Sequence, residues 1–247
     1  TENIMLAAVN AKGQTIIRNA AKEPEIIDLQ NFINAMGGKV WGAGSNSIII
    51  QGTSDLHEVD YRVIPDRIVA GTYMVAAAIT GGDLWIENVI IEHLYPIISK
   101  LREAGCEIQA NGQELHIIGP KRPSSVHLLE TLPHPGFPTD MQAQMLALLT
   151  VADGTSVIIE NIFENRYKHV AELIRMGAQV TIKDRMAVIK GVESLTGAAV
   201  EAKDLRGGAA LVLAGLRAKG TTEVSNIYLI DRGYEELDKQ LCALGAE

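Results

Sequence analysis

The segment Thr15-Ile16-Ile17-Arg18-Asn19 is a short β-branched strand that ends in asparagine, and the chain repeats this pattern three more times. The other copies are Leu84-Trp85-Ile86-Glu87-Asn88, Ser156-Val157-Ile158-Ile159-Glu160-Asn161 and Thr222-Glu223-Val224-Ser225-Asn226. Successive closing asparagines are 69, 73 and 65 residues apart. Self-similarity at a nearly fixed period indicates a fold built from copies of one supersecondary unit.

A second marker recurs with the same period. A glycine follows a helical apolar pattern in each copy, at Gly37, Gly105, Gly177 and Gly245. Glycine at this place is typical of a helix that ends in a left-handed residue. Strands are expected over 47–50, 115–118 and 186–189, and they close the first three copies. The sequence therefore predicts an α/β fold of four repeats, the last of which ends at Glu247 before its closing strands.

Composition excludes several classes of protein. The chain has 247 residues, of which 47% are hydrophobic and 21% charged, as in ordinary globular domains. The net charge is −8, so no nucleic-acid or membrane-surface partner is expected. Two cysteines and six scattered histidines form no disulfide framework and no metal-ligand spacing, so no metal is expected. The expected compartment is the cytoplasm.

The joint between the first and second repeats is longer and more polar than the others. It covers residues 57–65, and we place a domain boundary near Tyr61, between residues 1–61 and 62–247. The chain opens at Thr1, within a predicted helix and without an initiator Met. We therefore expect it to be part of a longer protein.

Asp140 is the first candidate for a catalytic group. First helices of the repeats are expected to start near Thr1, Asp66, Asp140 and Asp204. Three prolines and a glycine stiffen the loop over 133–139, and Thr139 has capping-box spacing to Gln142. One interpretation is a charge that stabilises a helix end. The other is a rigidly held carboxylate that takes a proton from a substrate hydroxyl.

Arginines lie at the starts of the helices that follow. Arg166 and Arg232 occupy equivalent loops between a strand end and a helix, where arginine suits capture of phosphate or carboxylate. The alternative is a surface ion pair with the adjacent Glu164 or Asp231. Arg206 is a third arginine at a helix start.

Two further features, a glycine pair and a glutamate, each have a functional and a simpler interpretation. The Gly207-Gly208 pair after Arg206 would let a ligand approach the backbone, although a glycine pair alone is a weak signal. Glu23 lies in the matching loop of the first repeat, where its charge could equally belong to a solvated helix start.

These motifs together resemble the enolpyruvyl transferases over the whole chain. The matching strings are Phe137–Gln144 (FPTDMQAQ), Phe163–Arg166 (FENR), Asp204–Arg206 (DLR) and Ile230–Glu235 (IDRGYE). They are similar to the UDP-N-acetylglucosamine 1-carboxyvinyltransferases of that family rather than to its shikimate-pathway branch. The resemblance implies an inside-out α/β barrel of six βαβαββ units in two domains. Residues 1–61 would be the last unit of the first, sugar-nucleotide-side domain. Residues 62–247 would be two full units and a truncated third of the second.

The resemblance also implies a reaction. These enzymes transfer the enolpyruvyl group of phosphoenolpyruvate to the 3-hydroxyl of UDP-N-acetylglucosamine and release phosphate, in the first committed step of peptidoglycan synthesis. The implied partners are the two small-molecule substrates and the missing N-terminal part of the same protein, with no cofactor.

Residue roles follow from the matching motifs. Asp140 resembles the carboxylate that contacts the sugar hydroxyl and acts as base. Arg206 and Arg232 resemble the residues that hold phosphoenolpyruvate and steady the tetrahedral intermediate. The implied substrate-binding residues are Asp140, Thr139, Ile162, Phe163, Glu164, Arg166 and Glu23, the last facing the cleft from the other domain.

Two elements of the family have no match in this sequence. They are a Lys-Asn pair near the N-terminus and a loop that bears a Cys or Asp general acid. Neither Cys106 nor Cys242 matches that loop. We therefore expect this chain to be inactive alone. The alternatives are a related transferase with another acceptor, such as shikimate 3-phosphate, and a non-catalytic, repeat-built binding fragment.

Overall fold

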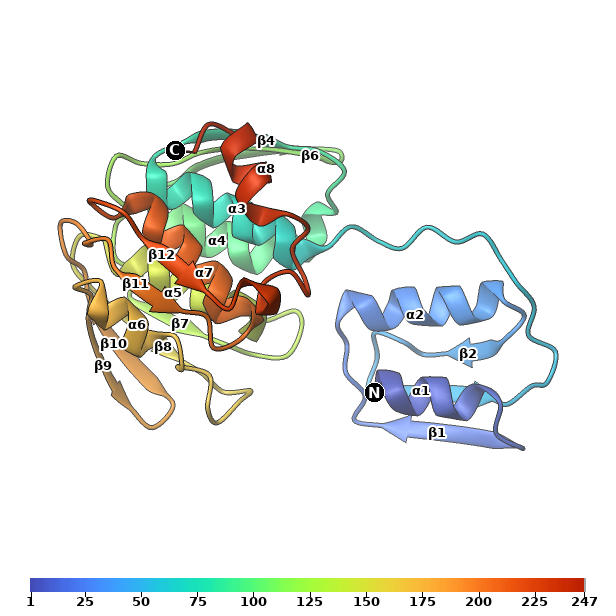
Figure 1. The fold of residues 1–247 in the computed structure, drawn as a ribbon. Helices are drawn as coiled ribbons and strands as arrows, with labels where there is room; N and C mark the ends of the chain where they lie inside the picture. Colours follow the sequence, from blue (N-terminus) through green and yellow to red (C-terminus); the bar gives the residue numbers. More distant parts are fainter. Residues whose placement is uncertain (247) are drawn as a thin grey trace. The chain divides into compact units, whose positions relative to one another are not determined.

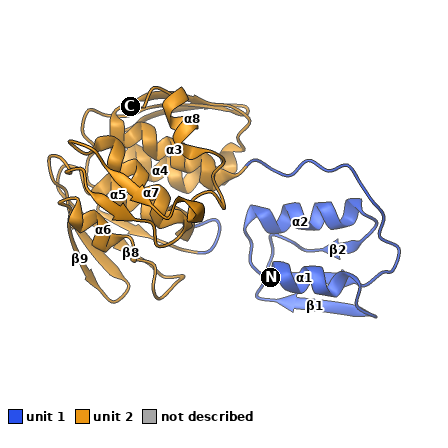
Figure 2. Cartoon of the chain, viewed as in Figure 1, with its two compact units in different colours: residues 1–65, 133–136 blue, residues 66–132, 137–247 orange. Residues whose placement is uncertain are grey.

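A computed structural model describes residues 1–246, which divide into two compact units (Figure 1). Unit 1 comprises Thr1–Pro65 with Pro133–Gly136, and unit 2 comprises Asp66–Leu132 and the chain from Phe137 onward (Figure 2). The division falls between Pro65 and Asp66, a little beyond Tyr61. The assignment of residues 1–61 and 62–247 to two domains of a larger fold stays a prediction, and Glu247 lies outside the described residues.

Unit 1 contains one copy of the repeat. Its elements are α1 (Glu2–Val9), β1 (Gln14–Arg18), α2 (Pro24–Ala35), β2 (Lys39–Trp41) and β3 (Ser47–Gln51). The strands form an antiparallel sheet in the order β1-β3-β2, so the last strand lies in the middle. The core of the unit is aliphatic and includes Met5, Ile26, Ile33, Ile48 and Ile50.

Unit 2 has three internal helices. Its α-helices are α3 (Arg67–Thr80), α4 (Tyr95–Glu103), α5 (Gln142–Leu149), α6 (Val170–Arg175), α7 (Leu205–Arg217) and α8 (Leu237–Ala243). Short 3-10 turns are η1 (Ile91–Leu94), η2 (Thr139–Met141) and η3 (Ile227–Leu229). Helices α3, α5 and α7 pack on one another, and every residue of α5 is buried. The sheets of unit 2 lie outside these helices (Figure 1), as the inside-out α/β prediction requires.

Each repeat of unit 2 contributes its own sheet. The strands are β4 (Asp83–Ile86), β5 (Glu107–Asn111), β6 (Glu114–Ile118), β7 (Leu128–Glu130), β8 (Thr155–Ile159), β9 (Gln179–Lys183), β10 (Met186–Lys190), β11 (Ala199–Glu201) and β12 (Glu223–Ser225). The sheet orders are β4-β6-β5, β7-β8-β10-β9 and β11-β12. β7 and β8 are parallel, whereas β8, β10 and β9 are antiparallel. The run β7-α5-β8-α6-β9-β10 is therefore a complete βαβαββ unit.

Both markers of the repeat have a backbone cause. Gly37, Gly105, Gly177 and Gly245 have φ of 91°, 96°, 93° and 97°, which confirms them as left-handed helix ends. Asn19, Asn88 and Asn226 have φ of 54°, 56° and 59°. Asparagine is one of the few side chains that tolerate this region. Asn161 is the exception among the four, and its repeat carries the site described below.

A further glycine position recurs that sequence analysis did not single out. The residue after each closing strand, Gly52, Gly119 or Gly191, donates its N–H to the carbonyl of Gly13, Gly82 or Gly154, respectively. A Cβ on these three residues would lie 1.6, 2.2 and 1.8 Å from the carbonyl oxygens of Ala11, Ala77 and Ala152. The end of the first helix therefore lies so close to the closing strand that only glycine fits.

Candidate active site

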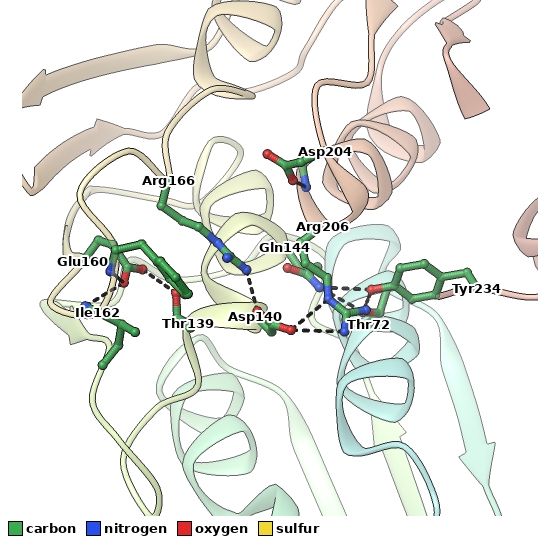
Figure 3. Close-up of polar contacts among 12 residues, drawn as sticks. Thr72, Thr139, Asp140, Gln144, Glu160, Ile162, Arg166, Asp204, Arg206 and Tyr234 are labelled. Atoms are coloured by element: carbon green, nitrogen blue, oxygen red, sulfur yellow. Dashed lines mark hydrogen bonds and ion pairs between the residues drawn. The ribbon is translucent and has the colours of Figure 1, made fainter. Parts of the chain in front are cut away.

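Asp140 lies between two guanidinium groups of unit 2 (Figure 3). Arg166 Nη2 donates to Asp140 Oδ1 at 2.5 Å, and Arg206 donates to Oδ2 from Nε and Nη2, each at 3.2 Å. The Asp140 side chain is 38% exposed, whereas that of Arg206 is only 12% exposed. The carboxylate thus stays accessible while both of its oxygens are engaged by largely buried cations.

Asp140 differs from its two counterparts in the repeat. Asp66 caps α3 by accepting from the N–H groups of Ile68 and Val69 at 2.7 and 3.0 Å, and Asp204 caps α7 through Gly207 N at 2.7 Å. Asp140 makes no capping hydrogen bond and sits inside η2, which precedes α5. The helix-end interpretation therefore holds for Asp66 and Asp204 but does not account for the contacts of Asp140.

The predicted capping box at Thr139 is wrong. The hydroxyl of Thr139 donates to Glu160 Oε2 at 2.9 Å, and neither η2 nor α5 has a side-chain cap. The reason is that the chain enters α5 through a 3-10 turn. Thr139 lies within that turn and not at the N-cap position ahead of it, and its hydroxyl is directed toward the buried Glu160 carboxylate.

A buried polar cluster supports Arg206. The guanidinium carbon of Arg206 lies 5.4 Å from the centre of the Tyr234 ring. The Tyr234 hydroxyl hydrogen-bonds Thr72 Oγ1 at 2.9 Å, and Gln144 Nε2 donates to Thr72 Oγ1 at 3.1 Å and to the Tyr234 hydroxyl at 3.3 Å. Sequence analysis missed this cluster. The available signal was a polar residue inside each of two apolar helices, Thr72 in α3 and Gln144 in α5.

Arg206 keeps its charge despite its burial. Burial would lower the pKa of Arg206, but the interactions with Tyr234 and Asp140 outweigh this effect and raise it above the ordinary value. Its remaining nitrogen, Nη1, is buried and has no hydrogen-bond partner within residues 1–246. Arg206 thus holds Asp140 with Nε and Nη2, while Nη1 is enclosed by the protein.

The Gly207-Gly208 pair has a packing role, which corrects the suggestion of a ligand approach. A Cβ on Gly208 would lie 2.6 Å from Ile230 Cγ1, and one on Gly207 would lie 3.0 Å from His169 Cβ. The space into which a side chain would project from each glycine is thus filled by protein. The pair lets the first turn of α7 approach Ile230 and His169 closely.

Arg232 makes no hydrogen bond or ion pair with Asp140. It is exposed, and among the described residues it makes no hydrogen bond or ion pair, including none with Asp231. Its loop nevertheless touches Arg206, because a Cβ on Gly233 would lie 3.5 Å from Arg206 Nη1. The role of Arg232 in holding substrate stays a prediction.

The loop after β8 carries Arg166 and three other predicted residues. The guanidinium carbon of Arg166 lies 5.1 Å from the centre of the Phe163 ring, and Ile162 and Phe163 are exposed. Glu164 pairs with Arg185 at 3.5 Å, not with Arg166. The alternative of an Arg166–Glu164 surface pair is therefore wrong, because Asp140 takes that guanidinium.

His169 lies beside the arginines and is fully buried. Burial lowers its pKa from 6.5 to about 4, with a smaller opposing effect of Asp204 and a further lowering by Arg166. Neither ring nitrogen has a hydrogen-bond partner within the described chain. The imidazole is therefore neutral at physiological pH.

Glu23 belongs to unit 1, where it precedes α2 without capping it. Its Oε1 accepts from His134 N at 3.5 Å, within the same unit, and its Oε2 is buried without a hydrogen-bond partner among residues 1–246. The interpretation as a solvated helix start does not fit these contacts. That Glu23 faces the substrate stays a prediction.

Residues 1–246 show neither a metal-binding cluster nor a membrane-spanning helix. No group of three or more His, Cys, Asp or Glu residues there could hold a metal ion. None of the described helices combines the length and apolar character needed to span a membrane. Cys106 is buried and Cys242 exposed, and both are free thiols.

Comparison with known proteins places this geometry in a family. The family model described as EPSP synthase (3-phosphoshikimate 1-carboxyvinyltransferase) matches residues 1–241. The chain belongs to the EPSP synthase family. The predicted kinship with the enolpyruvyl transferases is thereby confirmed.

Relatives within the family are close in sequence. The chain is 56% identical over its whole length to UDP-N-acetylglucosamine 1-carboxyvinyltransferase 2 of Caldanaerobacter subterraneus subsp. tengcongensis. It is 54% identical over the same length to UDP-N-acetylglucosamine 1-carboxyvinyltransferase of Myxococcus xanthus. In each case it spans 59% of the relative's own length.

Solved structures agree on the fold. The enolpyruvyl transferase NikO from Streptomyces tendae superposes with a TM-score of 0.86 at 26% identity, covering 98% of this chain and 58% of that one. EPSP synthase from Acinetobacter baumannii gives a TM-score of 0.73 at 21% identity, with 98% and 59% covered. The enolpyruvyl transferase fold predicted from the repeats is confirmed.

Proposed function

We propose that this chain belongs to an enzyme that transfers the enolpyruvyl group of phosphoenolpyruvate to the 3-hydroxyl of UDP-N-acetylglucosamine, with release of phosphate. This is a step of peptidoglycan precursor synthesis. The names of the relatives and the matching motifs support the substrates. The observation that carries the chemistry is the accessible Asp140 carboxylate held by Arg166 and Arg206.

Asp140 is the general base in this proposal. It takes the proton of the acceptor hydroxyl as the oxygen bonds to the enolpyruvyl carbon. General-base catalysis needs a carboxylate held in position and reachable by the hydroxyl. Asp140 meets both conditions, because η2 and two guanidinium groups fix it while part of it remains exposed.

The arginines supply the positive charge that a phosphate-bearing and carboxylate-bearing substrate requires. Arg206 donates from Nε and Nη2 to Asp140, so its charge lies directly beside the carboxylate. A cation in this position stabilises the negative charge of the tetrahedral intermediate next to the base. Arg232, Thr139, Ile162, Phe163 and Glu23 are assigned to substrate binding on the same resemblance.

The rest of the machinery is assigned to the part of the relatives that this chain does not span. The proposal places the general acid and a further substrate-binding cation there, since neither has a matching motif in this sequence. The chain alone should then show no turnover, and the partner it needs is the remaining length of the same protein.

Phosphate release tests the proposal. The protein in its natural length should release phosphate from phosphoenolpyruvate with UDP-N-acetylglucosamine and not with shikimate 3-phosphate. Residues 1–247 alone should release no phosphate. Phosphate release should appear when the remaining part of the protein is added as a second polypeptide. Phosphate release with shikimate 3-phosphate but not with UDP-N-acetylglucosamine would instead favour the related transferase. No phosphate release with either acceptor would favour a non-catalytic binding fragment.

A further inference from the structure

Glu160 is a fully buried glutamate at the end of β8, outside the residues assigned so far. Its Oε1 accepts from the N–H groups of Ile162 and Phe163 at 2.9 and 3.0 Å, and its Oε2 accepts from the Thr139 hydroxyl at 2.9 Å (Figure 3). A buried carboxylate is costly unless donors satisfy it. Here three donors from two separate loops converge on one side chain.

Those two loops carry the two ends of the Asp140–Arg166 contact. Thr139 directly precedes Asp140 in η2. Phe163 lies in the loop that leads to Arg166, and its ring lies against the Arg166 guanidinium. Arg166 donates to Asp140, so the contacts form a closed ring that starts and ends at Glu160.

We propose that Glu160 is a positioning residue of the candidate active site, whose carboxylate fixes the turn that carries Asp140 against the loop that carries Arg166. The base and its guanidinium partner are thereby aligned together. The catalytic part of this inference rests on the proposed role of Asp140. The positioning part does not, since it concerns only how two loops are held.

The chain offers a matched control in Glu172. This glutamate of α6 is also buried, and its Oε2 accepts from Glu201 N at 3.3 Å and pairs with Arg175 at 3.7 Å. Its side chain is bonded to none of the residues that form the ring of contacts, which are Glu160, Thr139, Asp140, Arg166 and Phe163. Glu172→Ala therefore removes a buried carboxylate from the same unit without opening the ring of contacts.

The kinetic test compares Glu160→Ala, Glu160→Gln and Glu172→Ala in the natural-length protein. Glu160→Ala should lower kcat about 10²-fold, the loss expected when a catalytic group shifts by an ångström. Glu160→Gln should stay within about tenfold of the parent, since the amide oxygen can accept from both N–H groups in weaker, neutral hydrogen bonds. Glu172→Ala should lower the melting temperature but leave kcat unchanged. Equal loss of kcat in both alanine variants, or a glutamine variant as impaired as Glu160→Ala, overturns the proposal.

Amide hydrogen exchange tests the positioning without activity. Glu160→Ala should speed exchange at Ile162 and Phe163 and also at Met141, whose N–H closes the Asp140 turn on Pro138 O at 3.0 Å. Glu172→Ala should leave these three amides unchanged. Unaltered exchange at Met141 in Glu160→Ala contradicts the proposal. If the unsubstituted protein releases no phosphate, the proposed function fails, whereas this measurement still decides the role of Glu160.

Discussion

Arg206 donates two hydrogen bonds to a single oxygen of Asp140, Oδ2, from Nε and Nη2 at 3.2 Å each. The other oxygen of Asp140, Oδ1, accepts a hydrogen bond from Arg166. Because one carboxylate has two cations, the three residues carry a net positive charge. That surplus of positive charge attracts anions to this part of unit 2.

Asp140→Asn should lower kcat by about 10²–10⁴-fold in the natural-length protein, because it removes the proposed proton acceptor and keeps the shape. Affinity for UDP-N-acetylglucosamine, measured by calorimetry, should change little. The control is Asp66→Asn, in which asparagine can still cap α3. If Asp140→Asn has the same kcat as the unsubstituted protein, Asp140 is only a structural charge.

Arg206→Lys should lower kcat/KM for phosphoenolpyruvate about 10²-fold, since lysine keeps the charge but loses the planar fork of charge-assisted hydrogen bonds. Arg217→Lys, in the last turn of the same helix α7, is the control and should act like the parent. Equal kinetics in both variants would show that only the charge matters.

Tyr234→Phe should destabilise the chain by about 1–2 kcal/mol, because it removes a buried hydroxyl that bonds Thr72 and Gln144. Thermal unfolding of residues 1–247 measures the change. Tyr228→Phe is the control, since Tyr228 is exposed. A melting temperature equal to that of the control would mean that the cluster adds nothing to stability.

His169 should make the chain less stable in acid. Its folded-state pKa is lowered from 6.5 to about 4, mainly by burial, so the unfolded chain takes up this proton first as the pH falls. The free energy of unfolding is therefore unaffected by this group well above pH 6.5, and it decreases progressively as the pH falls from 6.5 to 4. The loss is on the order of 3 kcal/mol for a shift of this size.

The measurement is the free energy of unfolding between pH 7 and pH 4, compared with His169→Leu. That variant should lose less stability over the range than the parent. His127→Leu replaces an exposed histidine of the same unit and should follow the parent curve. Parallel curves for the parent and His169→Leu contradict the expectation.

Gly191→Ala should destabilise the chain by about 3 kcal/mol, because the new methyl group would lie 1.8 Å from the carbonyl oxygen of Ala152. Gly215→Ala is the control. Gly215 lies inside helix α7, and its new methyl group would lie 3.2 Å from Thr222 Cβ. The free energy of unfolding should therefore change by no more than about 1 kcal/mol. Urea unfolding compares the two, and equal midpoints would show that the strand end can move away.

The repeated architecture could be predicted because its signals are local. Gly105 and Asn88, for example, mark a helix end and a strand end through their own backbone angles, which the residue type reveals. Asp140 and Arg166 could be predicted because each occupies a recognisable place in the repeat, ahead of a helix. Contacts between distant residues could not be predicted. Thr72 and Tyr234 are 162 residues apart in the sequence, and their hydroxyl groups meet only in the folded chain.

Glu160 illustrates a second limit of sequence patterns. It occupies the place before a strand-closing asparagine, as Glu87 does in the preceding repeat, where the side chain is exposed. Nothing in the local pattern separates the two glutamates. The difference arises because Thr139 and the 162–163 backbone surround Glu160 in the folded chain.

The three aspartates at equivalent helix starts have divided their tasks. Asp66 and Asp204 each keep a helix cap, an interaction of about 1 kcal/mol, whereas α5 begins without one. Redundancy makes this specialisation tolerable, because a unit assembled from duplicated parts can forgo one cap and still be held by the sister copies. The same place in the repeat therefore serves helix stability in two copies, whereas in the third copy its aspartate is held by two arginines instead.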